Sequence, residues 1–183
     1  MEKIIIEQSK ELNGEVKISG SKNSSLPILA ATILYGGTYK LSNVPDISDV
    51  RTMLKLIESL GGEYTFKNNE ATIDSTEISS YKAPYELVKT MRASVVVWGA
   101  LLGRFGKAEI SFPGGCAIGD RPVDQHIKGF ESIGYSTNIN NGYLETKKIN
   151  SIGGEHCFDL KSVTGCENVI LASVLGDNKT ILK

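Results

Sequence analysis

The residue types best suited to chemistry lie close together in residues 113–126, P-G-G-C-A-I-G-D-R-P-V-D-Q-H. Cys116 follows two glycines, which adopt unusual backbone conformations and let a ligand approach the main chain closely. Arg121 comes shortly afterwards, and a cation near a thiol lowers the pKa of that thiol and increases the reactive thiolate fraction. We interpret this segment as a reactive loop. The alternative is a buried, inert Cys116 beside a turn.

The elements that must position this loop recur along the chain. The segment ILASVLGDNKT, which begins at Ile170, resembles ILAATILYGGT, which begins 142 positions earlier at Ile28. A third related segment begins at Val97, 69 positions after Ile28. The sequence therefore predicts three copies of one unit, at about residues 22–90, 91–161 and 162–183. The third copy stops after its first helix and strand.

Each unit contains one amphipathic helix followed by paired strands. Apolar residues recur at helical spacing on one face, and glycine ends each helix at residues 61–62 and 134. In the first unit this face consists of Val50, Met53, Leu54, Ile57 and Leu60, and in the second of Val123, Ile127, Phe130 and Ile133. Residues 63–67, 71–74 and 136–140 alternate in polarity, which predicts strands that bury one face.

The first helix of each unit has a different pattern. Residues 26–34 and 93–102 are apolar almost all the way round, which is typical of helices at the centre of a core. Central helices combined with strands that bury one face predict an α/β (α+β) fold. We expect an inside-out α/β barrel of repeated units, with buried helices, outer sheets and an incomplete third unit.

The register of the repeats also indicates where chemistry lies. Gly37 and Gly61 are 24 positions apart, whereas the equivalent Gly106 and Gly134 are 28 positions apart. The second unit therefore has four additional residues, which fall in the loop around Cys116. An insertion confined to one copy favours a functional loop, and a tolerated surface insertion is the alternative.

The starts of the three first helices carry cations, hydroxyls and free backbone N–H groups. They contain Lys22 and Asn23 in the first copy, Lys89 and Arg92 in the second, and residues 162–165 in the third. The free amides and the positive end of the helix dipole both favour an anion, so these sites suit phosphate. Taken singly, each could instead be a helix cap or a solvated surface charge.

Composition excludes several other classes of protein. Of the 183 residues, 40% are hydrophobic and 22% charged, and a net charge of −1 gives no electrostatic attraction to nucleic acid or an anionic membrane. The longest apolar run, residues 95–102, is too short to span a bilayer, and no export signal is visible. Three widely spaced cysteines and two histidines favour a reducing compartment over disulfides, and allow no metal cluster. We therefore expect a cytoplasmic protein.

Four longer motifs resemble the UDP-N-acetylglucosamine 1-carboxyvinyltransferase family of enolpyruvyl transferases. They are ISGSKNSSLP at residues 18–27, NVP and SDV at residues 43–50, APYELVKTMRAS at residues 83–94, and the Cys116 loop. The resemblance extends from Gly14 to Thr180, and the motifs occur in the order typical of the N-terminal portion of the family. It is more specific than any single short motif.

The resemblance implies the first committed step of peptidoglycan synthesis, in which the 3′-hydroxyl of UDP-N-acetylglucosamine attacks phosphoenolpyruvate and phosphate leaves. It implies no metal or organic cofactor. Cys116 matches the general acid that can form a covalent adduct and is the target of fosfomycin. The matching substrate-binding residues are Lys22, Asn23 and Arg92, then Arg121, Pro122, Val123, Asp124 and Gln125 at the uridine, and Lys161, Ser162, Val163 and Thr164 at the diphosphate.

In the family, a second domain completes the site. By resemblance, residues 1–21 are N-terminal strands that pack with that domain, and residues 22–183 form an incomplete first domain. We therefore expect a complementary C-terminal portion, without which the chain turns over poorly. The alternatives are an inactive UDP-sugar-binding remnant and 3-phosphoshikimate 1-carboxyvinyltransferase, against which the Cys116 loop and residues 121–124 argue. His126 is interpreted as structural.

Overall fold

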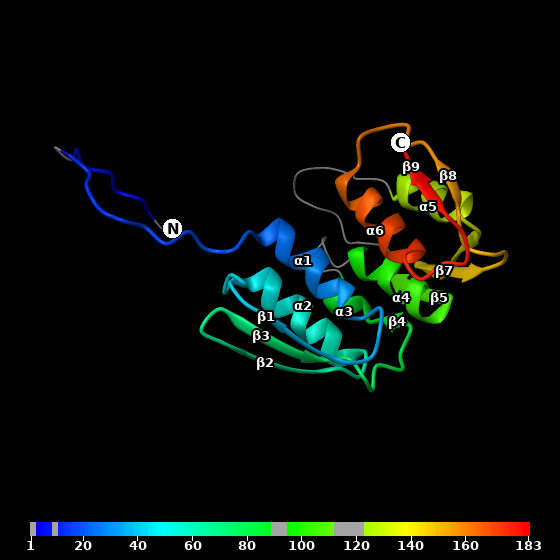
Figure 1. Ribbon diagram of the computed structural model, residues 1–183, viewed down its shortest axis with the longest axis horizontal. Helices are drawn as coiled ribbons and strands as arrows, with labels where there is room; N and C mark the ends of the chain where they lie inside the picture. The colour runs from blue at the N-terminus through cyan, green and yellow to red at the C-terminus, as the bar shows by residue number, and fades with distance from the viewer. Residues whose placement is uncertain (1–2, 9–10, 89–94, 112–122) are drawn as a thin grey trace.

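Two units follow one another with the same order of elements apart from the short helix α3, and a third begins after them (Figure 1). The computed structural model describes residues 3–8, 11–88, 95–111 and 123–183. The first unit consists of α1 (Lys22–Ala31), β1 (Thr38–Leu41), α2 (Ser48–Ser59), β2 (Glu63–Lys67), β3 (Glu70–Asp74) and β4 (Lys82–Ala83). The second consists of α3 (Tyr85–Val88), α4 (Val97–Phe105), β5 (Lys107–Ser111), α5 (Asp124–Ser132), β6 (Tyr135–Asn140), β7 (Tyr143–Lys148) and β8 (Gly154–His156). The third consists of α6 (Val163–Ser173) and β9 (Thr180–Leu182).

The sheets of the first two units have the same topology. Antiparallel strands are arranged β1-β3-β2 in the first unit and β5-β7-β6 in the second. The short strand β4 pairs in parallel with β5, and β8 pairs in parallel with β9. The last strand of each unit therefore joins the sheet of the following unit. β2 has the predicted bounds, and β3 and β6 each begin one residue before the predicted strand.

Equivalent hydrogen bonds confirm the repeat and its additional residues. The N–H of Ser75 donates to the carbonyl of Gly37 at 3.0 Å, and the N–H of Lys148 donates to the carbonyl of Gly106 at 2.7 Å. Gly106 lies 69 positions after Gly37, whereas Lys148 lies 73 positions after Ser75. The four additional residues therefore lie between Gly106 and Lys148, in agreement with the predicted insertion.

Helices lie inside the molecule and sheets lie outside it, as predicted. α4 packs against both α1 and α6, and the three helices run in the same direction in Figure 1. Residues 97–102 of α4 are all buried, so the prediction of a central helix is confirmed there. It is wrong for one face of α1 and of α6, where the equivalent residues Ile28 and Ile170 are each 50% exposed. No element in the described part of the chain covers these two faces.

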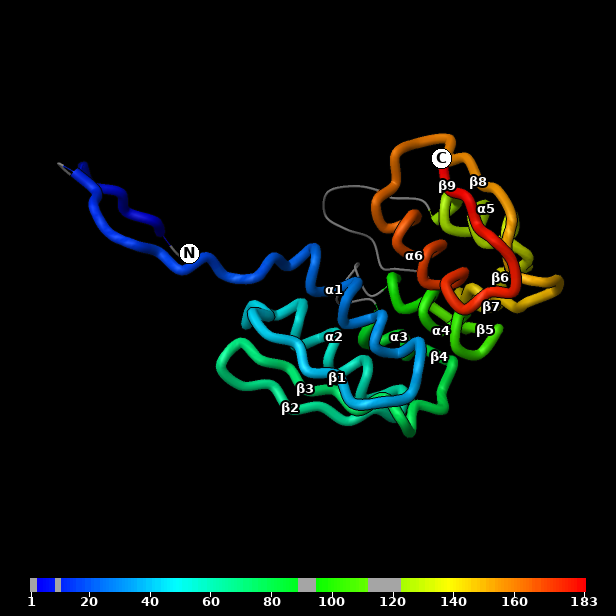
Figure 2. Tube along the Cα trace, viewed as in Figure 1, coloured from blue at the N-terminus to red at the C-terminus, as the bar shows by residue number. Residues whose placement is uncertain are grey.

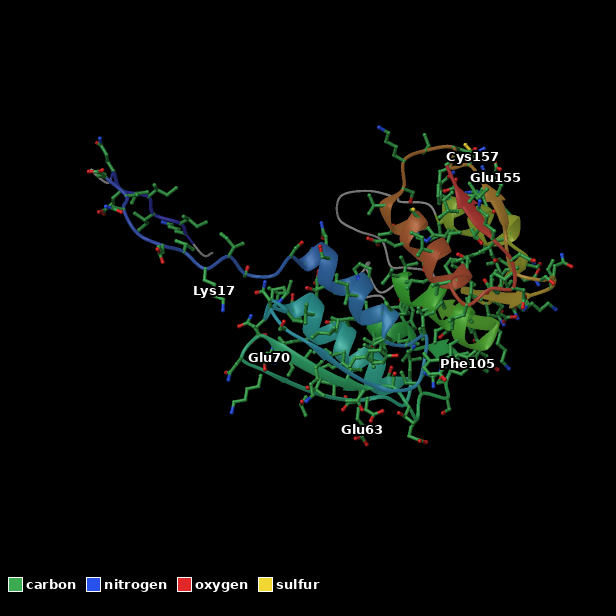
Figure 3. The ribbon with its side chains drawn as sticks, in the orientation of Figure 1. Lys17, Glu63, Glu70, Phe105, Glu155 and Cys157 are labelled. Atoms are coloured by element: carbon green, nitrogen blue, oxygen red, sulfur yellow. The ribbon has the colours of Figure 1, made fainter. Side chains whose placement is uncertain are left out.

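The N-terminal segment extends away from the helices and sheets (Figures 1 and 2). Residues 3–8 and 11–19 are exposed, and the described residues in this segment form no strand. Its apolar side chains, among them Ile4, Ile6, Val16 and Ile18, are therefore in contact with solvent. Lys17 marks this segment in Figure 3.

Two further observations concern the described ranges only. None of their helices is long and apolar enough to cross a membrane. Within the same ranges, no three or more His, Cys, Asp or Glu side chains form a group that could hold a metal ion.

Candidate functional site

The start of α6 has the features of an anion site. Ser162 precedes the helix, and its side-chain oxygen accepts a hydrogen bond from the N–H of Gly165 at 3.1 Å. Lys161 and Val163 are exposed, and Thr164 is half-buried. Because Gly165 supplies one of the first N–H groups of the helix, the Ser162 cap satisfies that group, while the helix dipole still favours an anion beside Lys161.

The start of α5 is tied to the loop that leads into α6. Val123 is buried before the helix, and Asp124 is its first residue. The side-chain oxygen of Gln125 accepts from the N–H of Asp159 at 3.1 Å, and its side-chain nitrogen donates to Oδ2 of Asp159 at 3.3 Å. The structure thus attaches Gln125 to the loop that leads directly into residues 161–164.

Charge reinforces this connection. Lys128 Nζ lies 2.6 Å from Oδ2 of Asp159, and this hydrogen bond, together with the one from Gln125, lowers the pKa of the Asp159 carboxyl. The ionised Asp159 carboxylate is therefore the favoured partner of Gln125 and Lys128 on α5.

Asp124 has an acceptor that its surroundings leave unused. Its Oδ2 accepts from the side-chain nitrogen of Gln125 at 3.0 Å, whereas its Oδ1 is buried and has no partner among the described residues. A buried acceptor without a donor costs free energy. This atom is suited to a ligand that carries an N–H or O–H group.

The start of α1 carries the first predicted group. Lys22 is the first residue of the helix, and its Nζ lies 3.2 Å from Oδ2 of Asp49. The neighbouring Asn23 is exposed. The chain entering α1 lies against the NVP motif, because a Cβ atom on Gly20 would be 1.8 Å from the carbonyl oxygen of Asn43. Only glycine allows this approach, so two of the quoted motifs meet here.

The N-terminal ends of α1, α4 and α6 lie on the same side of the molecule in Figure 1. Lys22, Asn23 and residues 161–164 therefore share that side, as the helix-start hypothesis requires. Arg92, Cys116, Arg121 and Pro122 lie outside the described residues, and their predicted roles stay predictions. The other two cysteines are free: Cys157 is exposed beside β8 (Figure 3), and Cys166 is half-buried on α6.

Comparison with protein families identifies the relationship. The model of the EPSP synthase (3-phosphoshikimate 1-carboxyvinyltransferase) family matches residues 6–183. The chain belongs to this family. Its curated relatives include proteins named UDP-N-acetylglucosamine 1-carboxyvinyltransferase from Saccharophagus degradans, 48% identical, and Cellvibrio japonicus, 50% identical. Both matches cover 100% of this chain and 44% of the relative, so the chain spans less than half the length of these relatives.

Solved structures of related enzymes share the fold of this chain. The enolpyruvyl transferase NikO from Streptomyces tendae matches with a TM-score of 0.71 and 18% identity, over 90% of this chain and 38% of its own. An EPSP synthase from Acinetobacter baumannii matches with a TM-score of 0.70 and 15% identity, over 93% of this chain and 40% of its own. At these identities the likeness concerns the fold.

One residue near these helix starts was not predicted from the sequence of this chain. Asn168 on α6 is fully buried and hydrogen-bonds to His126, which is itself 4% exposed. The available signal was a single amide directly before the apolar residues 169–172 of α6, because a buried polar side chain in a helix needs partners.

Proposed function

We propose that this chain is part of an enzyme that transfers the enolpyruvyl group of phosphoenolpyruvate to the 3′-hydroxyl of UDP-N-acetylglucosamine and releases phosphate. The observation that carries the proposal is identity of 46–50% along the whole chain with proteins named for that reaction. The expected cytoplasmic location, the role in peptidoglycan synthesis, cell shape and division, and sensitivity to fosfomycin belong to the same proposal.

Each predicted residue has a physical role in this reaction. The acceptor hydroxyl gives its proton to a general base as its oxygen adds to the central carbon of phosphoenolpyruvate, and the methylene carbon becomes a methyl group by taking a proton from Cys116. The methyl carbon then loses a proton as the bond between the central carbon and the phosphate oxygen breaks, which restores the double bond and releases phosphate. Lys22 and Arg92 suit the phosphate and carboxylate groups, because ammonium and guanidinium groups make charge-assisted hydrogen bonds to them. Asn23 adds a neutral hydrogen-bonding side chain at the same helix start.

The nucleotide sites follow the geometry of α5 and α6. Residues 161–164 lie at a helix start, where backbone N–H groups and the helix dipole favour the diphosphate. Residues 121–125 are assigned to the uridine, and the unused Oδ1 of Asp124 would accept from an N–H group of the nucleotide. Burial of that oxygen makes the match specific, since an unsatisfied acceptor is costly.

Covalent labelling tests the assignment of Cys116. Fosfomycin should add its mass once to the intact chain, and peptide mapping should place the adduct on Cys116. Cys157 and Cys166 are free thiols, so Cys157→Ser and Cys166→Ser serve as matched controls that should still be labelled. Labelling that survives Cys116→Ser would contradict the assignment.

A turnover assay tests the activity of the chain by itself. We expect little phosphate release from phosphoenolpyruvate and UDP-N-acetylglucosamine, because a site that cannot close loses the benefit of positioning and water exclusion. A rate of about 1 per second or faster would be typical of a complete enzyme and would overturn this expectation.

The second candidate acceptor is shikimate 3-phosphate, which the name of the matching family model favours. At equal concentrations, the ligand that binds the folded state more tightly raises the melting temperature more, because the stabilisation grows with the logarithm of the ratio of ligand concentration to Kd. We expect UDP-N-acetylglucosamine to raise the melting temperature more than shikimate 3-phosphate does. The reverse order would favour the second candidate. A shift with UDP-N-acetylglucosamine is also expected of an inactive UDP-sugar-binding remnant, whereas no shift with either acceptor would contradict all three readings.

We also propose that a complementary portion, consisting of a helix followed by a β-hairpin, completes the third unit. In both preceding units such a segment follows the first strand, and its second strand, β3 or β7, pairs with that first strand. β9 pairs only with β8 among the described strands, so its other edge is available. The half-exposed Ile28 and Ile170 provide apolar contacts for the additional helix.

Thr180 supports the hairpin in particular. Thr38 occupies the equivalent position in β1, and its hydroxyl donates to Oδ2 of Asp74, its partner on β3, at 3.1 Å. The Thr180 hydroxyl is buried and has no partner in the described part of the chain. An incoming strand with an acceptor opposite Thr180 would satisfy it.

Complementation tests this proposal. The probe is the part of the Cellvibrio japonicus relative that lies C-terminal to the matched region, and it should form a 1:1 complex in size-exclusion chromatography and increase phosphate release. Thr180→Val should weaken the complex about 2- to 10-fold, whereas Thr180→Ser, which keeps the hydroxyl, should not. Absence of a complex, or equal affinities for the two variants, would contradict the proposed pairing.

A further inference from the structure

We infer that Asn168 is a positioning residue: one buried side-chain amide joins the middle of α6 to the beginnings of α4 and α5 and fixes the proton of His126 on Nε2. The inference rests on the proposed function for its consequence, because these three helices follow the segments that carry the predicted substrate residues. Its structural part depends only on the hydrogen bonds of the described residues.

Asn168 uses all of its hydrogen-bonding groups. Its Oδ1 accepts from the N–H of Gly99 at 2.6 Å, and its Nδ2 donates to the carbonyl of Val95 at 3.1 Å. Nδ2 also lies 2.9 Å from Nδ1 of His126. The side chain is fully buried, so these contacts offset the cost of removing an amide from water.

The contact with Gly99 replaces a missing helix cap. Val96, at the N-terminus of α4, makes no side-chain capping hydrogen bond. Gly99 supplies one of the first N–H groups of α4, which have no acceptor within the helix. Glycine is needed here, since a Cβ atom would lie 2.2 Å from the carbonyl oxygen of Asn168. A residue of the third unit thus caps a helix of the second.

The backbone around Asn168 determines the orientation of its amide. Gly99 offers a donor, whereas Val95 offers an acceptor. If the amide were rotated, two donors would face each other at Gly99 and two acceptors at Val95. Nδ2 is therefore the atom that faces His126.

That orientation decides the state of His126. Nδ2 has only hydrogens to offer, so Nδ1 of His126 must accept, and the neutral ring carries its proton on Nε2. The ring is also held by stacking on Trp98, with centroids 6.3 Å apart and an interplanar angle of 10°. The proton of His126 therefore stays on Nε2, and the ring does not exchange between its two tautomers.

The consequence concerns the geometry of the substrate site. Residues 89–94 with Arg92 precede α4, residues 112–122 with Cys116 precede α5, and Lys161 precedes α6. α6 packs against both α4 and α5 (Figure 1), and Asn168 connects the middle of α6 to α4 and α5 near the points where residues 89–94 and 112–122 lead into them. A shift in any one helix start would displace the substrate groups that precede it.

Nuclear magnetic resonance on the full chain provides the test, because the protein has two histidines and their ring nitrogens are readily distinguished. We expect His126 to be protonated on Nε2 in the absence of ligand, with a scalar coupling between its Nδ1 and Nδ2 of Asn168. Protonation on Nδ1, or a missing coupling, would overturn the inference without any variant.

Two variants separate positioning from packing. Asn168→Asp keeps the acceptor for Gly99 but removes both donors, so the His126 proton should move to Nδ1. Thr146→Val removes the hydroxyl that accepts from Nε1 of Trp98 at 3.0 Å and should leave His126 unchanged. An unchanged tautomer in Asn168→Asp, or a changed one in Thr146→Val, would refute the inference. Adding UDP-N-acetylglucosamine afterwards tests the proposed function separately, since the tautomer is read without ligand.

Discussion

The phenol of Tyr135 joins two of the central helices. Its hydroxyl lies 2.9 Å from the carbonyl oxygen of Ala172 and 3.3 Å from that of Leu102, so one proton serves two acceptors. Burial, with a smaller effect of the Asp177 charge, raises the pKa of Tyr135 from 10.0 to about 12. The folded state therefore favours the neutral phenol.

This pKa predicts a stability change at alkaline pH. Above pH 10 the unfolded chain releases the phenolic proton before the folded chain does, so the free energy of unfolding should fall as pH rises from about 10 to about 12. Urea unfolding across this range measures the effect. Tyr135→Phe should be less stable at neutral pH but lose less stability on the alkaline side, and equal slopes for both proteins would contradict the assignment.

Single residues of the site differ in how far the sequence could predict them. Val123, Asp124 and residues 161–164 belong to local motifs at helix starts, and the structure places them at helix starts. The sequence offers an amide beside an apolar run at Asn168 but not its partners, because Val95, Gly99 and His126 lie on segments far away in the sequence. These three residues come within hydrogen-bonding distance of the Asn168 side chain only when the chain folds.

Among the elements, α4 is attached to the first unit by Arg104. Its Nη1 donates to the carbonyls of Ile33 and Ser75, each at 2.9 Å, and its Nη2 donates to that of Thr76 at 3.2 Å. These acceptors lie beyond the ends of α1 and β3. One side chain thus fixes two elements of the first unit against a helix of the second.

Removal of this side chain should loosen the contact between units. Arg104→Ala leaves partly buried carbonyls without donors, so we expect the free energy of unfolding to fall by about 1–3 kcal/mol. Arg51→Ala is the matched control, because Arg51 pairs with Asp46 at the exposed surface and should change stability much less. Urea denaturation measures both variants, and equal losses would show that Arg104 does not act as described.

The predicted elements were those whose pattern is local. The apolar face of α2 and the alternation in β2 predict those elements directly, since their buried sides are determined by their own residues. β4 and β8 were not predicted, because they have two and three residues and are defined by partners in the following unit. Exposure of Ile28 and Ile170 likewise depends on neighbouring elements, which the apolar pattern of a helix does not specify.

For the molecule as a whole, the N-terminal segment adds apolar surface without adding to the core. All described side chains in residues 3–8 and 11–18 are exposed. Deletion of residues 1–18 should therefore change the free energy of unfolding by less than about 0.5 kcal/mol, as for surface changes in general. Urea unfolding of the shortened and full chains measures this, and a loss of about 1 kcal/mol or more would reveal an unrecognised contact.

Because β4 pairs in parallel with β5 and β8 with β9, the repeat in the sequence and the sheet in the structure differ in their boundaries by one strand. A repeat excised at its sequence boundary would take the outer strand of its neighbour's sheet with it. The copies consequently interlock, and a single copy separated from its neighbours would lack one strand of its own sheet.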